Sequence, residues 1–313
     1  MSLPNNNDIA LKEKFTTMLD RKYKASSKTA FMDADPSLLR ATVDAKTFMI
    51  PARTMSGLFD YGRNTGFQTG IVENRYIPFT FQMDRGTALY VDAVDNLETA
   101  LLMIADLANQ LLEEHVAPET DAYRLSKYAN YAIDAGNHDD VGGLNATNVV
   151  DRISLATKEL EENEAPLDSL IMFVTPETRR LMELNDMVGK SRSVDRPSST
   201  AINFKVHEWN DMPIITVPPS RMATSYIFRN ISSPAVNTAD GGFEIASDAR
   251  QIDFLIMNPK SAMQLTKRAK ERWWNPDNNP RGDGYTLEYR IYHDAFVTPE
   301  RAKGMFVATS PIT

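Results

Sequence analysis

The histidines come first as candidates for chemistry, because an imidazole can bind a metal ion or move a proton near neutral pH. The chain has four of them, and none has a second histidine four residues away, the spacing that places two metal ligands on one helix face. The best metal candidate is the run of His138, Asp139 and Asp140. Adjacent residues on a flexible loop rarely converge on one ion, so we interpret this run as a polar loop and expect no metal site.

Nucleophilic chemistry has few candidates. There is no cysteine, which excludes disulfides, thiolate metal sites and a thiol nucleophile. The sequence contains no G-x-S-x-G elbow, no Walker A loop and no G-x-G-x-x-G after a predicted strand. A serine–histidine–aspartate site stays open, because its members converge only in space. A soluble hydrolase that uses His138 or His293 with a neighbouring aspartate is therefore one alternative, and it requires a concave pocket.

The charge of the chain argues against a general nucleic-acid binder. Of the 313 residues, 34 are Lys or Arg and 42 are Asp or Glu, so the net charge is −8. Residues 1–30 are basic by contrast and are expected to form an amphipathic arm, which is either solvated or in contact with a polyanion or a partner subunit. A second basic run, at a predicted helix C-terminus, is either favoured by the helix dipole or used in such a contact. Its members are Lys267, Arg268, Lys270 and Arg272.

A hairpin and a long helix are the elements that would position most of these groups. Residues 46–93 are rich in strand-forming types and are interrupted by glycine, a pattern that predicts a long two-stranded excursion with a polar tip. A lone hairpin is marginal in water, so it must rest on its own chain or on a neighbour. Residues 95–117 have apolar side chains in steps of four and three, which predicts a long helix that ends at Pro118. A second helix is predicted after Thr120.

Charged residues gather on the hairpin and at its junction with the long helix. At the junction, acids and one arginine stand close in sequence. They either steer the hairpin onto a partner surface or simply give a helix N-terminus its favourable acids. Together with the basic run above, the candidates for contacts between subunits are Arg53, Asp60, Arg63, Arg75, Asp84, Arg85 and Asp92.

From residue 136 onward, helices and strands are mixed, and the fold class is α+β. We predict helices at 147–163, from Pro176, and from Pro259 to about residue 270. Strands are predicted at 170–174, 252–257, 285–297 and 304–309, with a tight hairpin around residues 210–211.

This order of elements resembles the major capsid protein of tailed bacteriophages, which has the Hong-Kong-ninety-seven-type (Johnson) fold. The shared order is a basic N-terminal arm, a glycine-tipped hairpin, a long helix, a mixed α/β region and a final strand pair. Local strings are similar to capsid proteins from phages of Gram-positive hosts: FQMDRGTALYVDAVDNLETA, VAPETDAYRLSKYA, DFLIMNPKSAMQLTKRAK, YRIYHDAFV and KGMFVATS. The likeness covers most of residues 35–313.

The resemblance implies a division of the chain and a structural role. The parts would be an N-terminal arm (1–45), an E-loop hairpin (46–94), a P-domain with a spine helix (95–135), an A-domain (136–250) and a return to the P-domain (251–313). Such a subunit has no enzymatic activity and no cofactor. Pentamers and hexamers of it would close into an icosahedral shell around double-stranded DNA.

Further partners and a location follow from the same resemblance. The partners are a separate scaffolding protein, a portal and, in some shells, a decoration protein, with packaged DNA bound non-specifically and no membrane. The subunit would assemble in the host cytoplasm and reside in the virion capsid. A shell protein of the encapsulin-like nanocompartment type shares the fold and is the nearest alternative, and the soluble hydrolase is the more distant one.

We predict that the shell lacks a covalent cross-link made through a hairpin lysine, a device that the family can use. No lysine occurs between Lys46 and Lys127, and the hairpin carries Arg53, Arg63 and Arg75 instead. Assembled particles should therefore run as a single monomer band on a denaturing gel. A covalent ladder that disappears when Lys46 is substituted would contradict this prediction.

Overall fold

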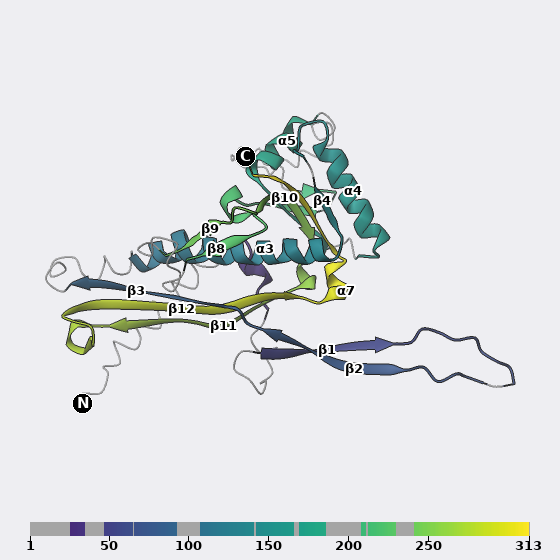
Figure 1. Ribbon diagram of the computed structural model, residues 1–313, viewed down its shortest axis with the longest axis horizontal. Coiled ribbons are helices and arrows are strands. Elements are labelled where there is room, and N and C mark those ends of the chain that lie inside the picture. Colours follow the sequence, from purple (N-terminus) through teal and green to yellow (C-terminus); the bar gives the residue numbers. More distant parts are fainter. Residues whose placement is uncertain are drawn as a thin grey trace, which may run out of the picture.

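The computed structural model is an α+β protein, the class predicted from the sequence, and a long helix lies between its two larger sheets (Figure 1). The structure describes residues 26–34, 47–64, 66–92, 107–140, 142–165, 169–185, 208–210, 212–229 and 241–312. The predicted helix of the N-terminal arm and residues 95–106 of the predicted long helix lie outside these residues.

The larger sheet has six strands in the order β4-β13-β10-β5-β7-β6. Their bounds are His138–Asp140, Met305–Pro311, Arg250–Met257, Ile171–Val174, Met212–Thr216 and Glu208–Trp209. The central strand β10 is antiparallel to both β13 and β5, whereas β4 pairs parallel with β13, and β7 pairs parallel with β5. The predicted strands in this region are confirmed, as is the tight hairpin, which turns at Asn210 with a positive φ of 45°.

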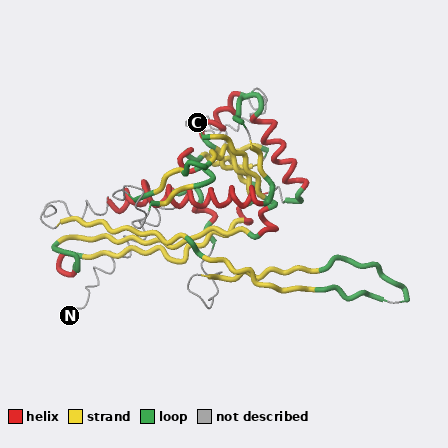
Figure 2. Tube along the Cα trace, in the orientation of Figure 1, coloured by secondary structure: helices red, strands yellow, loops and turns green. Residues whose placement is uncertain are grey.

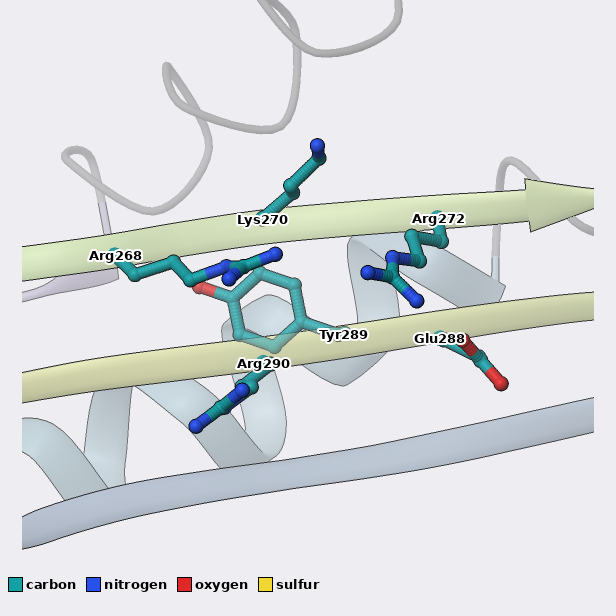
Figure 3. A pocket seen from close by; sticks show the side chains of 6 residues that line it. All are labelled: Arg268, Lys270, Arg272, Glu288, Tyr289 and Arg290. Atoms are coloured by element: carbon teal, nitrogen blue, oxygen red, sulfur yellow. The ribbon is translucent and has the colours of Figure 1, made fainter.

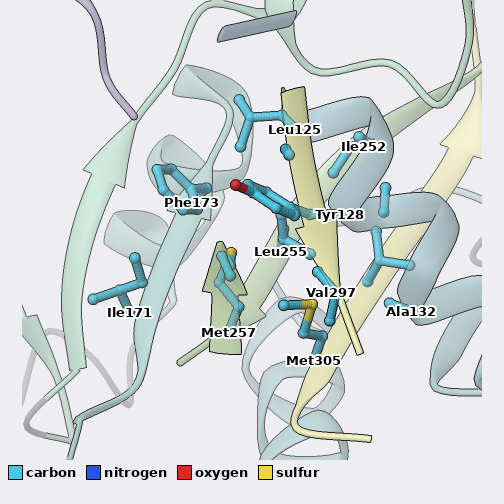
Figure 4. Packing of buried hydrophobic residues seen from close by; sticks show 14 of the residues in the cluster. Leu125, Tyr128, Ala132, Ile171, Phe173, Ile252, Leu255, Met257, Val297 and Met305 are labelled. Atoms are coloured by element: carbon cyan, nitrogen blue, oxygen red, sulfur yellow. The ribbon is translucent and has the colours of Figure 1, made fainter. Parts of the chain in front are cut away.

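This sheet is covered on both faces, which is why its inner strands β5 and β10 are largely apolar in the sequence, whereas the edge strands β4 and β6 are not. Successive residues of a strand point to opposite faces. In β5, Ile171 and Phe173 belong to one core cluster, and Met172 and Val174 belong to the other. The first cluster includes side chains of the long helix α3 (Ala117–Asp134), as Figure 4 shows.

Two helices cover the second face and follow their sequence patterns. The predicted apolar stripe of α4 (Val149–Glu162) is buried and consists of Val149, Ile153, Ala156 and Leu160. Helix α5 (Pro176–Leu184) begins with the predicted proline in its first turn. The Thr175 hydroxyl accepts a hydrogen bond from the Thr178 amide at 3.1 Å and thereby caps this helix. Both helix predictions are confirmed.

The smaller sheet has three long strands in the order β11-β12-β3, with bounds Ala262–Trp274, Gly284–Val297 and Met83–Asp92. The helix predicted from Pro259 to about residue 270 is wrong, because only a 3-10 turn (η7, Pro259–Ser261) precedes strand β11. Lysine, arginine, glutamine and alanine favour a helix locally. The backbone ladder with strand β12, which follows residues 275–283, outweighs this weak preference.

The long helix does not end at Pro118, as the sequence predicted. Its described part starts at residue 107, passes through a π-helical segment (η4, Leu111–Val116) and continues as α3. In the π segment the acceptor lies five residues back, as in the bond from the Ala117 amide to the Leu112 carbonyl. This wider turn accommodates a proline, which has no N–H and would otherwise clash with the carbonyl four residues before it. The two predicted helices are therefore one.

Two hairpins and several short turns complete the fold. β1 (Thr47–Met55) and β2 (Val72–Thr80) form a long hairpin that projects from the body of the molecule (Figure 2). The predicted excursion over residues 46–93 is therefore shorter than expected, because residues 83–92 are strand β3 and pair with β12. β8 (Tyr226–Phe228) pairs with β9 (Phe243–Ile245) next to α3. The short helical turns are η1 (Ala30–Met32), η6 (Pro219–Arg221), η8 (Pro276–Asn278) and α7 (Pro299–Ala302).

A buried carboxylate holds the N-terminal segment 26–34 against α3. Asp121 is fully buried, and five donors reach its two oxygens. Ser27 Oγ lies at 2.6 Å, the Lys28 amide at 2.8 Å, the Thr29 amide and hydroxyl at 3.1 and 2.8 Å, and the Arg221 guanidinium at 3.2 Å. A buried charge is costly unless such bonds replace water, so the segment and the helix order one another.

We predict that Asp253, at the irregular step of β10, makes folding stability depend on pH. Burial raises the pKa of its carboxyl to about 6, and the bond from the Ser310 hydroxyl at 3.0 Å offsets only part of this effect. A pKa raised in the folded state means that this group destabilises the fold increasingly as the pH rises from about 4 through 6. Asp253→Asn should therefore gain up to about 3 kcal/mol over the wild type between pH 4 and pH 8.

Urea unfolding of the purified chain at both pH values measures this difference. Ser310→Ala is the control, because it keeps the buried carboxyl and should keep the pH dependence. The same pH dependence in the wild type and in Asp253→Asn would show that this carboxyl does not titrate in the expected range.

Candidate assembly surfaces

The root of the β1–β2 hairpin is fixed to the smaller sheet by aromatic packing. The rings of Phe79 and Phe81 lie 5.0 and 5.5 Å from the ring of Phe296, between centroids. The backbone that follows is fixed as well, because the Gln82 amide donates to the fully buried carboxylate of Asp294 at 2.8 Å. The root therefore sets the direction in which the hairpin leaves the subunit.

The far end of the hairpin, which the sequence predicted to be polar, instead exposes several large apolar side chains among its polar residues. Leu58 and Phe67 are 105% and 91% exposed, and the rings of Tyr61 and Phe67 contact each other at 4.9 Å between centroids. We call this patch the apolar tip, and its members are Met55, Leu58, Phe59, Tyr61, Phe67, Ile71 and Val72. A contiguous exposed apolar patch marks a surface that another molecule covers.

The hairpin charges predicted as subunit contacts surround this tip. Arg53 on β1 and Arg75 on β2 lie along the two strands, and Asp60 and Arg63 lie in the loop between them. All four are exposed, and none of them forms an ion pair with another described residue. They are placed where a partner could reach them, and their role as contacts stays a prediction.

Arg85, predicted at the junction, finds its partners within its own chain. On β3 it forms a two-bonded ion pair with Glu119 of α3, at 2.6 and 3.3 Å. The same guanidinium donates to the carbonyls of Arg229 and Gly242, at 2.7 and 3.1 Å, where the β8–β9 hairpin opens. It also lies 5.9 Å from the centre of the Phe228 ring. One side chain thus joins the smaller sheet, the long helix and the β8–β9 hairpin.

The other junction residues lie along the same strand. Asp84 forms an ion pair with Arg290 of β12, with bonds of 2.8 and 2.5 Å. Asp92 ends β3 opposite Gly284 and is exposed. The junction charges of Asp84 and Arg85 therefore serve contacts inside one subunit, which the sequence did not reveal, and any further role between subunits stays a prediction.

The basic run predicted at a helix end lies on β11, so the helix dipole is not the reason for its charge. Lys267 is the extra residue of a β-bulge, and its ammonium group lies 5.8 Å from the centre of the Phe81 ring. Arg268, Lys270 and Arg272 follow at alternate positions and are exposed. Alternate residues of a strand share a face, so these three point to the same side of the sheet.

Sequence reasoning missed a row of charges on α3 that have partners in distant segments. The pairs are Glu119 with Arg85, Asp121 with Arg221, Arg124 with Asp33, and Lys127 with Asp294. In the sequence these residues are spaced like the solvated face of any amphipathic helix. No local signal could have identified them, because only the folded chain brings their partners within reach.

The run 138–140 is the short edge strand β4 rather than the predicted polar loop. Its carboxylates bind arginines, since Asp139 pairs with Arg152 at 2.9 Å and Asp140 pairs with Arg250. Nowhere in the described residues do three His, Asp or Glu side chains gather closely enough to hold a metal ion. The described helices also include none that is long and apolar enough to cross a membrane.

His293, the other histidine weighed for hydrolysis, lies in the core beneath Tyr123, with the two rings 5.6 Å apart between centroids. Burial lowers the pKa of its imidazole well below the usual value, and the nearby charges of Arg124 and Lys127 lower it further. A side chain that is 1% exposed is out of reach of a substrate. The described structure therefore gives the hydrolase alternative no site at this residue.

The comparisons with known proteins find likeness in structure only. No family model matches the sequence, and no curated protein matches it significantly. The capsid of cyanophage P-SCSP1u matches with a TM-score of 0.59 at 11% identity, over 88% of this chain and 86% of that chain. The mature capsid of bacteriophage PhiM1 matches with a TM-score of 0.56 at 13% identity, over 85% and 82%. A chain of Mycobacterium phage Che8 matches with a TM-score of 0.55 at 11% identity, over 90% of both chains.

These matches cover nearly the whole of each chain, so the likeness is one of complete architecture rather than of a shared piece. The chain has the Hong-Kong-ninety-seven-type capsid fold, as the order of elements in the sequence predicted. At identities of 11–13% the likeness shows the fold. What the protein does with this fold must be argued from its own surfaces.

We predict that Arg85→Ala destabilises the subunit by about 2–4 kcal/mol, because it leaves the largely buried Glu119 carboxylate and two carbonyls without their donor. Urea unfolding measures the loss. Arg290→Ala is the matched control on the neighbouring strand: its ion pair with Asp84 is half exposed and should contribute far less. Equal losses in the two variants would refute the assignment of Arg85 as an internal joint.

Proposed function

We propose that this chain is the major capsid protein of a tailed bacteriophage, a non-enzymatic subunit that forms pentamers and hexamers in an icosahedral shell. The observation that carries the proposal is the hairpin, which has a fixed root and an exposed apolar tip on a subunit with the capsid fold. A monomeric enzyme or binding module has no use for such a projection, whereas a shell subunit needs a reach onto its neighbour.

In this proposal the apolar tip supplies the energy of assembly and the hairpin charges set its register. Burying a side chain of the size of Leu or Phe contributes about 1.5–3 kcal/mol. Leu58 and Phe67, which are almost fully exposed, are therefore the strongest anchors. Arg53, Asp60, Arg63 and Arg75 lie around them and would align the hairpin on the neighbouring subunit, since charge at the rim of an interface decides orientation more than affinity.

The remaining parts of the proposal concern the setting of the shell. We infer assembly in the host cytoplasm on a separate scaffolding protein, a portal at one vertex and double-stranded DNA held non-specifically inside. The net charge of −8 supports loose retention of DNA, because a strongly basic lining would oppose the movement of DNA during packaging. The division into arm, E-loop, P-domain and A-domain is part of the same proposal.

Expression of the full chain and negative-stain electron microscopy test the proposed function. The wild type should form closed shells, tubes or rings of five or six subunits. The double variant Leu58→Ser/Phe67→Ser should remain folded and should form at least tenfold fewer particles at the same concentration. Leu155→Ser/Leu184→Ser is the matched control, because these two leucines are half exposed on α4 and α5, away from the hairpin, and should leave assembly unchanged.

Two results would count against this proposal. One is a wild type that stays a compact monomer at every concentration, and the other is particle formation that is insensitive to the loss of the apolar tip. Particles that enclose protein cargo instead of DNA, when purified from infected cells, would favour the nanocompartment alternative over the phage head.

A further inference from the structure

The face of the smaller sheet that points away from α3 carries a concentrated positive charge. Four cations lie on this face of β11 and β12, and we call them the basic strip: Arg268, Lys270, Arg272 and Arg290. Figure 3 shows them around a shallow, open pocket of about 120 Å³ that Glu288 also lines. On the opposite face, Leu287, Tyr289 and Ile291 pack against the helix through Ala108 and Leu112. The strand alternation therefore separates an apolar, covered face from a cationic, open one.

Most of this charge is not neutralised within the described chain. Arg290 is paired with Asp84, and the nearby acid Glu288 is paired with Arg281 at 3.3 Å. Among the described residues, Arg268, Lys270 and Arg272 have no ion-pair partner. Lys270 also lies directly opposite Arg290 in the strand ladder, where like charges repel. This repulsion lowers the stability of the fold. Such locally unfavourable arrangements are common at binding surfaces.

The chemistry of the strip favours a phosphate backbone over a protein partner. The core of a protein–protein interface is apolar and depleted in charge, and the strip has the opposite composition. Residues two apart on a strand lie about 7 Å apart, so the three unpaired cations span about 14 Å. A B-form duplex carries one phosphate charge per about 1.7 Å of its axis, so such a row meets several phosphates in any register. Recognition of this kind does not depend on base sequence.

We propose that the basic strip is a contact for the phosphate backbone of double-stranded DNA. The proposal rests on the proposed function, in which the shell encloses double-stranded DNA, and it names a surface of the chain for contact with that DNA. A small cationic patch on a chain with a net charge of −8 gives weak contacts that are easily broken by salt. Such contacts suit DNA that must slide during packaging.

The test measures the affinity of the purified full chain for a fluorescent 30-base-pair duplex of random sequence. Fluorescence anisotropy reports the binding at salt concentrations between 50 and 200 mM. The triple variant Arg268→Gln/Lys270→Gln/Arg272→Gln should bind at least tenfold more weakly at the lowest salt. The slope of log affinity against log salt should fall in magnitude by about 2–3, close to 0.9 for each phosphate that the variant no longer neutralises. Arg268→Lys/Arg272→Lys keeps the charge and should retain binding.

The matched control removes three exposed cations elsewhere, by Lys158→Gln/Arg180→Gln/Lys303→Gln, and changes the net charge equally. It should bind DNA within twofold of the wild type. Equal weakening in the two triple variants would overturn the proposal, because general charge would then explain binding. Unchanged DNA binding with a loss of particles in the strip variant would overturn it too and would assign the strip to a subunit contact.

The two proposals fail in distinguishable ways. DNA binding is measured by anisotropy on the strip variants, whereas assembly is measured by microscopy on the hairpin variants. A strip that binds DNA on a chain that never assembles would remove the proposed function but leave the strip a DNA contact. A chain that assembles but does not bind DNA through its basic strip would support the proposed function and overturn the DNA contact.

Discussion

The subunit depends on one constraint, which is that the long helix carries charge into the protein interior and each charge must be met there by a distant segment. Asp121 and Arg124 are fully buried on α3, and Glu119 and Lys127 are mostly covered. An unpaired buried charge costs several kcal/mol, so the helix is stable only when its partners are in place. These partners come from β3, from the N-terminal segment, from η6 and from β12. One helix thereby obliges four separate parts of the chain to fold together.

Contacts at the root of the hairpin explain why it projects from the rest of the chain instead of packing against it. Its root is held by the packing of Phe79 and Phe81 on Phe296 and by the amide bond to Asp294, so its direction is fixed. Its tip keeps apolar surface exposed that a monomer would be expected to bury. In the proposed function, a rigid root with an uncovered tip lets contact at the tip set the orientation of neighbouring subunits in a closed shell.

Among the described residues, charged side chains in the interior have partners within the chain, whereas many of those on the surface do not. Where charge joins elements, as with Arg85 and Glu119, it is paired and mostly buried, and it confers specificity of packing. Where charge is left unpaired, as at Arg268, Lys270 and Arg272 of the basic strip and on the hairpin, the side chains are exposed. An ion pair shielded from water is little affected by salt. An exposed charge can interact with another molecule, and dissolved salt screens that interaction. The first kind builds the subunit, and the second is available for its partners.

Local sequence patterns determined much of this fold. The stripe of α4, the proline and threonine that begin α5, the buried strands of the larger sheet and the long hairpin could all be predicted, because each is encoded by neighbouring residues. The order of these elements was sufficient to predict the capsid fold, and the hairpin residues Arg53, Asp60, Arg63 and Arg75 proved to be exposed. Tertiary structure alone decided that 262–274 is a strand, that the helix passes through Pro118, that Arg85 and the charges of α3 are largely buried, and that Asp84 pairs with Arg290 at the surface. The strand 262–274 and the charge pairs depended on contacts with other segments, whose free energy exceeded the local preference that the sequence displays. The continuation of the helix through Pro118 depended on the π-helical turn before it.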